Sequence, residues 1–89
     1  RDLAMTLGIK LCIEDTWGSD IVTAAALHLG ASTDPKFLLN VCDLSHYVGP
    51  RLDESAPKRT DGYITVKDDV GLGVNPNMDI LGEPEIIWT

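Results

Sequence analysis

Two short apolar runs on either side of one helical segment constrain the fold more than any other feature of this sequence. The first, IKLCI, spans residues 9–13, and the second, FLLNVCDL, spans residues 37–44. Near-continuous apolar runs of this length are typical of parallel strands that are covered on both faces. Residues 20–31, between the runs, are apolar almost all the way around a helix, which favours a helix packed against a sheet. The pattern predicts a parallel strand–helix–strand unit.

Capping residues predict where the elements of residues 1–49 begin and end. Gly8 follows a short amphipathic stretch and suits the position just past a helix, so we expect the chain to open with the end of a helix. Ser19 or Asp20 is a suitable cap for the helix between the two strands, because both side chains accept hydrogen bonds from the first free amides.

A polar, turn-rich tail follows in residues 50–89. Asp61–Gly62 predicts a hairpin turn, since both residues tolerate the backbone that a tight hairpin needs. Asn75–Pro76 predicts the start of a short helix that Gly82 ends. Residues 85–89, EIIWT, are expected to form a closing strand.

One strand–helix–strand unit with a tail does not make a closed domain. Two parallel strands leave unpaired edges and an uncovered sheet face. The sequence also begins with Arg1 rather than with methionine. We therefore expect the rest of an α/β sheet to lie upstream of residue 1.

Composition excludes several classes of partner. The chain has 89 residues, with 14 acidic and 7 basic side chains. Such a chain has no basic patch to neutralise phosphates, which argues against nucleic acid. No apolar run approaches the roughly 18 residues that suggest a membrane span, so no membrane partner is expected. Cys12 and Cys42 lie in apolar runs, and we interpret them as buried thiols of a reducing, cytoplasmic compartment rather than as a disulfide.

Polar side chains follow both predicted strands, where parallel sheets and barrels place their sites. Six residues hold such positions: Glu14, Asp15, Thr16, Trp17, Asn40 and Asp43. Neighbouring strand residues point to opposite faces, so Glu14 and Asp15 enter one pocket only if the strand has already ended. The alternatives are that either carboxylate caps the helix or pairs with a cation, and that Trp17 only plugs the rim.

Two other patterns carry less weight. A zinc site would need closely paired ligands, and that spacing is missing among Cys12, His28, Cys42 and His46. Asp20 suits a helix cap better than a catalytic role. The sequence therefore predicts no metal site within this chain.

Three stretches of the sequence resemble one family. They are CIEDTWGSDIVTAAALHLGAST, VCDL and GLGVNPNMDILGEP. Together they are similar to the C-terminal end of the mandelate racemase/muconate-lactonising enzyme branch of the enolase superfamily. The first stretch is most similar to the subgroup acting on proline-type substrates, such as hydroxyproline dehydratases and proline-betaine epimerases.

The resemblance implies an α/β fold, the C-terminal fragment of a (β/α) TIM-type barrel. Residues 1–8 would end the sixth helix. Residues 9–14 would be the seventh strand, residues 20–31 the seventh helix and residues 38–43 the eighth strand. Residues 50–89 would cover the barrel and contact a capping domain.

The resemblance also implies a chemistry. A base removes the proton α to a carboxylate, and a divalent metal, usually Mg²⁺, stabilises the ene-diolate. The metal carboxylates and lysine bases would come from earlier strands, so the catalytic residues are expected upstream of this chain. Asp15 would face the ring-nitrogen cation of a small carboxylate substrate, with Trp17 beside it. The full-length enzyme is expected to be a homo-oligomer.

Departures from the family pattern separate the alternatives. Mandelate racemases proper have a histidine after the seventh strand and a glutamate on the eighth, and Asp20 and Asn40 stand at those places here. A mandelate-type racemase is therefore not expected. A sugar-acid dehydratase of the same superfamily would want a histidine base on the seventh strand. A non-catalytic acidic binding module would need a closed core of its own.

Overall fold

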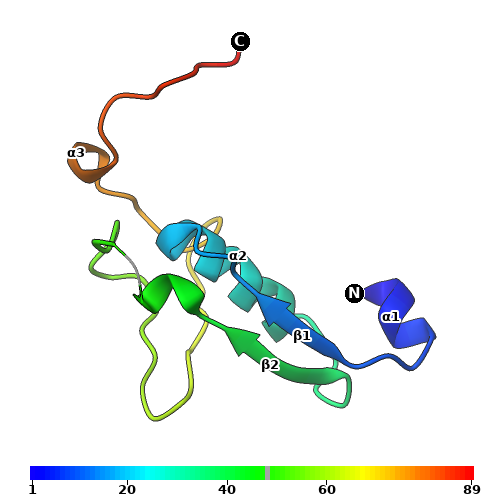
Figure 1. The fold of residues 1–89 in the computed structure, drawn as a ribbon. Helices are drawn as coiled ribbons and strands as arrows, with labels where there is room; N and C mark the ends of the chain where they lie inside the picture. The colour runs from blue at the N-terminus through cyan, green and yellow to red at the C-terminus, as the bar shows by residue number, and fades with distance from the viewer. Residues whose placement is uncertain (48) are drawn as a thin grey trace.

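The computed structural model describes residues 1–47 and 49–89 (Figure 1). In chain order the elements are α1 (Asp2–Thr6), β1 (Leu11–Glu14), α2 (Ser19–Ala31), β2 (Leu38–Cys42), the 3-10 helix η1 (Leu44–Tyr47) and α3 (Met78–Leu81). β1 and β2 pair in parallel, and α2 connects them and packs along the sheet. The predicted strand–helix–strand unit is confirmed, although β1 begins two residues later and β2 ends one residue earlier than expected. No helix in the described part is long and apolar enough to cross a bilayer.

The two faces of the sheet differ in what covers them. Ile13 is buried, and a Cβ atom at Gly30 of α2 would collide with the Val41 side chain, so both strand residues face α2. Ile13 and Val41 are also register partners. Because successive strand residues point to opposite faces, four residues make up what we call the open face of the sheet: Cys12, Glu14, Asn40 and Cys42.

The open face corrects the expectation about the cysteines. Cys12 is exposed and Cys42 is half-buried, and both thiols are free. The prediction that both are buried is wrong, because in the described residues α2 covers only the other face. The buried apolar core is correspondingly small and consists of Ile13, Ala24, Ala26, Leu27, Leu52 and Ala56.

The end of α1 follows the prediction. Gly8 has a left-handed φ of 71°. The Gly8 amide donates to the Met5 carbonyl at 3.1 Å, and the Ile9 amide donates to the Ala4 carbonyl at 2.8 Å. These two bonds form a Schellman motif, which glycine favours because it adopts this backbone at little cost.

The start of α2 does not follow the prediction. No side chain caps this helix, so the expectation of a Ser19 or Asp20 cap is wrong. The Asp20 carboxylate is instead turned toward the tail. Its Oδ2 accepts the amides of Leu52 at 2.8 Å and Asp53 at 3.2 Å, and its Oδ1 pairs with Arg51 Nη2 at 2.9 Å. Asp20 therefore anchors the first residues of the tail to α2.

The hairpin turn in the tail is confirmed as a turn. Asp61 and Gly62 have φ values of 51° and 82°, and two positive values in succession are typical of a type I′ turn. Thr60 and Tyr63 exchange backbone hydrogen bonds of 2.8 and 2.9 Å. Their pairing is an isolated bridge, and no regular strand flanks it in the part of the chain that is described.

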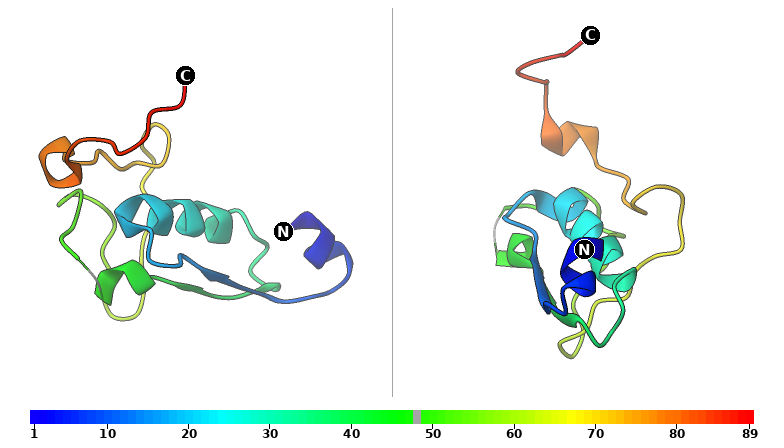
Figure 2. Two further views of the ribbon diagram at one scale, coloured as in Figure 1. Left: turned by 45° about the horizontal axis from the view of Figure 1, so that its top comes forward. Right: turned by 90° about the vertical axis from the view of Figure 1, so that its right-hand side faces the viewer.

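The last elements begin later and are fewer than expected. α3 begins after Asn77, whose side chain accepts the Asp79 amide at 2.9 Å, rather than at Asn75–Pro76. Gly82 ends it with a φ of 75°, as predicted. The prediction of a closing strand at residues 85–89 is wrong. This segment pairs with no sheet edge among the described residues. Figure 2 shows it running away from the strand–helix–strand unit.

Candidate functional site

The loop between β1 and α2 holds an unusual backbone. Thr16, Trp17 and Ser19 have positive φ values of 49°, 62° and 64°. Such values are uncommon in residues other than glycine, and strain of this kind persists where surrounding contacts enforce it, often at functional sites. The loop leaves Trp17 60% exposed. The indole therefore stands at the edge of the sheet where parallel strands end and ligands commonly bind.

The Asp15 carboxylate is fully buried, with 0% of the residue accessible. Thr23 Oγ1 and the Ser45 amide donate to its Oδ2 at 2.5 and 3.1 Å, and the Trp17 amide reaches Oδ1 at 3.3 Å. Burial by itself raises the pKa of this carboxyl, but the hydrogen bonds outweigh it, so the pKa lies below its ordinary value. Asp15 is an ionised anchor that joins β1, α2 and η1 and supports the Trp17 loop.

The six predicted site residues fall into three places. The open face carries Glu14 and Asn40, the loop exposes Thr16 and Trp17, and the interior holds Asp15 and Asp43. Glu14 and Asp15 do point different ways, as the alternation of a strand requires. Of the two carboxylates, Glu14 is the exposed one.

Asp43 lies directly after β2 and is buried. Its Oδ1 accepts a hydrogen bond from Arg59 Nη1 at 3.0 Å. The Arg59 guanidinium also lies 5.6 Å from the centre of the Tyr47 ring, within the range of a cation–π contact. Asp43 thus attaches the tail to the end of β2, and a contact between Asp43 and a ligand stays a prediction.

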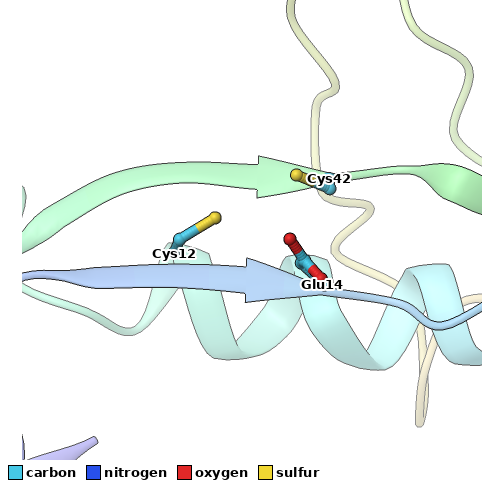
Figure 3. A group of neighbouring side chains, drawn as sticks. All are labelled: Cys12, Glu14 and Cys42. Atoms are coloured by element: carbon cyan, nitrogen blue, oxygen red, sulfur yellow. The ribbon is translucent and has the colours of Figure 1, made fainter.

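One cluster of potential metal ligands was not predicted from the sequence. Cys12, Glu14 and Cys42 each bring one potential ligand atom to within 4.8 Å of the others (Figure 3). Burial raises the pKa of the Cys42 thiol, and the Cys12 thiol raises it further. Cys12 and Glu14 are two residues apart on one strand, and this spacing predicts that both side chains lie on the same face of the sheet. Cys42 joins them only through the pairing of β1 with β2.

The two histidines do not join this cluster. Within residues 1–47 and 49–89 the only group of three potential metal ligands is the one that contains both cysteines and Glu14. His28 Nε2 lies 3.3 Å from the Leu72 carbonyl oxygen instead. The four-residue zinc set rejected on its spacing is therefore not assembled.

A cavity of about 670 Å³ runs beside β2, and its lining is mainly apolar. It includes Leu27 of α2, Val41 of β2 and Tyr63 of the tail, and it does not include Trp17. Among the described residues β2 pairs with β1 and with no second strand. An apolar groove along such a strand suits the packing of a further structural element better than a small polar ligand.

Known proteins match this chain along nearly its whole length. Residues 1–80 match the family described as enolase C-terminal domain-like. Over 84 residues the chain is 49% identical to the cis-3-hydroxy-L-proline dehydratase of Roseibium aggregatum, an alignment that covers 94% of this chain and 23% of that protein.

Two solved structures from Roseovarius nubinhibens ISM have the same local fold. One is a mandelate racemase/muconate lactonizing enzyme, with a TM-score of 0.85 and 34% identity over 98% of this chain and 24% of that one. The other is a member of the enolase superfamily, with a TM-score of 0.82 and 31% identity over 96% of this chain and 23% of that one. The chain spans about a quarter of the length of the relatives it matches.

Proposed function

The chain belongs to the enolase C-terminal domain-like family, and from this premise we propose that it completes a barrel enzyme that removes a proton α to a carboxylate. The resemblance seen in the sequence is confirmed, as is the fold class of a C-terminal segment of a (β/α) TIM-type barrel. In such a barrel the helices form the outer ring. α2 would therefore face outward, and the open face of the sheet would line the interior.

The proposed substrate is a proline-type amino acid that carries a hydroxyl group next to its α-carbon. Loss of the α-proton and of that hydroxyl as water would make the enzyme a dehydratase, hence a lyase rather than an isomerase. The 49% identity to a cis-3-hydroxy-L-proline dehydratase supports this substrate class over the sugar-acid alternative.

The observation that carries the substrate class within this chain is the exposed Trp17 directly beyond Glu14 at the end of β1. The ring nitrogen of a proline-type substrate is cationic near neutral pH. An indole face attracts such a cation, and the exposed Glu14 carboxylate offers it a counter-charge. We assign these two residues to the substrate nitrogen. The remaining predicted residues that we keep in the proposed lining are Thr16, Asn40 and Asp43.

Asp15 receives a different role in this proposal. Its contacts with Thr23 and Ser45 support a positioning residue that holds the Trp17 loop, since its carboxylate is engaged inside the protein. A direct contact between Asp15 and the substrate, which the sequence suggested, would require the fully buried carboxylate to become accessible.

The described residues do not fit a magnesium site. Mg²⁺ prefers oxygen ligands in octahedral geometry, and the one group of three potential ligands in this part of the chain contains two thiols. We propose that Mg²⁺ and the lysine base are held by earlier strands of the full-length enzyme, where the metal would stabilise negative charge on the substrate carboxylate. Residues of this chain bind and orient the substrate.

The full-length enzyme tests the proposal by α-proton exchange in D₂O, followed by NMR. The probes are cis-3-hydroxy-L-proline, mandelate and a sugar acid, each with and without Mg²⁺. The expected result is Mg²⁺-dependent exchange and water loss with the hydroxyproline alone. Turnover of the sugar acid without turnover of the hydroxyproline would contradict the substrate class, and turnover of none would contradict the activity.

We also propose a cellular location and an oligomeric state for the full-length enzyme. The free thiols of Cys12 and Cys42 fit a reducing, cytoplasmic location. Ile86, Ile87 and Trp88 are exposed in the tail, which supports their packing in a homo-oligomer or on a capping domain. Light scattering of the full-length enzyme distinguishes an oligomer from a monomer.

A further inference from the structure

The cluster of Cys12, Glu14 and Cys42 has the composition of a site for a soft metal. Thiolate ligands select thiophilic cations such as Zn²⁺, whereas Mg²⁺ prefers oxygen ligands alone. Zn²⁺ takes three protein ligands and leaves its fourth tetrahedral position to water in many open sites. Two thiolates and one carboxylate are all anionic, so together they compensate the charge of a divalent ion.

The geometry of the strand pair holds these three side chains together. Cys12 and Glu14 lie two residues apart on β1 and share the open face. Glu14 and Cys42 are register partners across the parallel pair. Figure 3 shows the three side chains converging from the two strands.

The distances are close to those of a loaded site. All three ligand atoms lie within 4.8 Å of one another. Zinc bonds of about 2.0 to 2.3 Å in a tetrahedron place neighbouring ligand atoms roughly 3.3 to 3.8 Å apart. Closing the cluster around an ion therefore needs a side-chain adjustment of roughly 1 Å, without a change in strand register.

We propose that Cys12, Glu14 and Cys42 bind one Zn²⁺ ion, or another thiophilic divalent cation, on the open face of the sheet. The ion would bridge β1 and β2 and so fasten two strands that belong to distant parts of the sequence. All three ligands lie in this chain. Glu14 is also the counter-charge that we propose for the substrate nitrogen, so a bound ion would compete with that contact.

Equilibrium dialysis of the full-length enzyme against Zn²⁺ in excess Mg²⁺, with the thiols kept reduced by a phosphine, tests the site. The expected result is one Zn²⁺ per chain, undisturbed by excess Mg²⁺. Cd²⁺ is the spectroscopic probe, because thiolate–cadmium charge-transfer absorption should appear and saturate at one equivalent. More than one ion per chain, or displacement by Mg²⁺, would overturn the proposal.

Variants identify the ligands. Changing residues that only hydrogen-bond to metal ligands already reduces metal affinity about 10- to 100-fold. Cys12→Ser, Cys42→Ser and Glu14→Gln change the ligands themselves, so each should weaken Zn²⁺ binding at least about tenfold. Glu85→Gln is the matched control, since it makes the same change at an exposed carboxylate of the tail. Unchanged affinity in any of the three ligand variants would remove that residue and, with it, the proposed site.

A disordered chain could also bind zinc through its thiols, and Glu14 separates the two cases. Thiols of an unfolded chain would show equal affinity in Glu14→Gln and Glu85→Gln, and that result would overturn the proposal. Binding to the paired strands favours the structured state by roughly 100-fold at a zinc concentration of 100 times Kd. Zinc should therefore raise the thermal midpoint or helical circular-dichroism signal of the wild type and of Glu85→Gln more than that of Glu14→Gln.

Discussion

Asp15 connects the local chemistry of the strand end to the loop that carries Trp17. The carboxylate accepts one hydroxyl and two amide hydrogen bonds from Thr23, Ser45 and Trp17. Hydrogen bonds to charged groups contribute more than neutral ones, and their loss inside a protein leaves donors unpaired. The same residue therefore affects both the stability of the fold and the placement of the indole.

The first prediction separates a positioning role for Asp15 from a direct contact with substrate. In the full-length enzyme, Asp15→Asn and Thr23→Val each remove part of the buried hydrogen-bond set and should each cost about 1 to 3 kcal/mol of stability. Both should raise KM in the folded fraction, because both loosen the Trp17 loop. Thermal melts beside steady-state kinetics check this. A kinetic defect in Asp15→Asn that is absent from Thr23→Val would favour direct contact.

The second prediction concerns Trp17. If the indole faces the substrate cation, Trp17→Leu should lower kcat/KM by an amount corresponding to about 0.5 to 2 kcal/mol, and Trp17→Phe should lower it less. Stability should change little, since the residue is exposed. Asp15→Asn should lower kcat/KM more than Trp17→Phe does, because the loss of the Asp15 carboxylate disturbs the whole loop. Full kcat/KM in Trp17→Leu would leave Trp17 as a rim residue without a role in binding.

At the scale of elements, buried aspartates hold the tail against the strand–helix–strand unit. Asp20 of α2 accepts the amides of Leu52 and Asp53, and Asp53 in turn accepts the amide of Asn75 at 2.8 Å. The tail has little regular structure of its own. Hydrogen bonds between carboxylates and backbone amides therefore hold the tail in place, where a β-strand would use backbone-to-backbone hydrogen bonds.

The third prediction is a pH dependence of the tail contact. The amide of Asn75, followed by hydrogen bonds from Ser55, lowers the pKa of Asp53 to about 2. An unfolded aspartate titrates near 3.9, about two units higher. Because the unfolded chain binds the proton more readily, this contact stabilises the docked tail above about pH 4 and is lost as the pH falls toward 2.

Amide NMR signals of Ser55 and Asn75 report on this contact directly. Both should shift together between about pH 4 and pH 2, and Asp53→Asn should remove that shared transition. Signals that titrate at the ordinary aspartate value, or that behave identically in Asp53→Asn, would mean that Asp53 does not hold the tail.

The fourth prediction concerns the contact of α2 with β2. A Cβ atom at Gly30 would lie 2.5 Å from Val41 Cγ2, closer than real Cβ contacts allow. Gly30→Ala in the full-length enzyme should therefore cost about 1 to 3 kcal/mol through overpacking, partly offset by about 1 kcal/mol of helix propensity. Adding Val41→Ala should relieve the clash, so the double variant should lose less than the sum of the single ones. Simple additivity in thermal melts would contradict the contact.

At the scale of the whole molecule, the chain is more open than a complete domain. Its accessible surface is 6561 Å², whereas a folded monomer of 9.7 kDa has about 5100 Å². Its radius of gyration is 14.5 Å, against about 12 Å for a compact chain of this length. The open face of the sheet and the exposed C-terminal segment, which runs away from the strand–helix–strand unit in Figure 2, both contribute to this difference.

The fifth prediction is that the 89-residue chain without metal unfolds without a cooperative transition. Its apolar core is too small to offset the entropy of ordering the tail and the strands. Calorimetry and circular dichroism of the reduced chain check this, with the full-length enzyme as the reference. A sharp two-state melt of the monomeric chain would show that these residues fold independently.

Interactions between residues close together in the chain explain which features could be predicted from the sequence alone. The order of helices and strands follows from apolar periodicity, and the ends at Gly8, Asp61–Gly62 and Gly82 follow from backbone conformations that these residues adopt at low cost. The family resemblance rests on the same contiguous stretches. Residues 85–89 show where prediction from a local pattern fails. Their pattern favours a strand, but a strand also needs a pairing partner, which a local pattern does not supply.

Tertiary structure decided which side chains are available. Glu14 and Asp15 are adjacent and chemically alike, yet Asp15 is buried because Thr23 and Ser45 pack over it, while Glu14 lies on the open face. Cys12 and Cys42 meet only because β1 and β2 pair in one register. Burial and register depend on contacts between residues far apart in the chain, and free energies of such contacts are not contained in any local stretch of sequence.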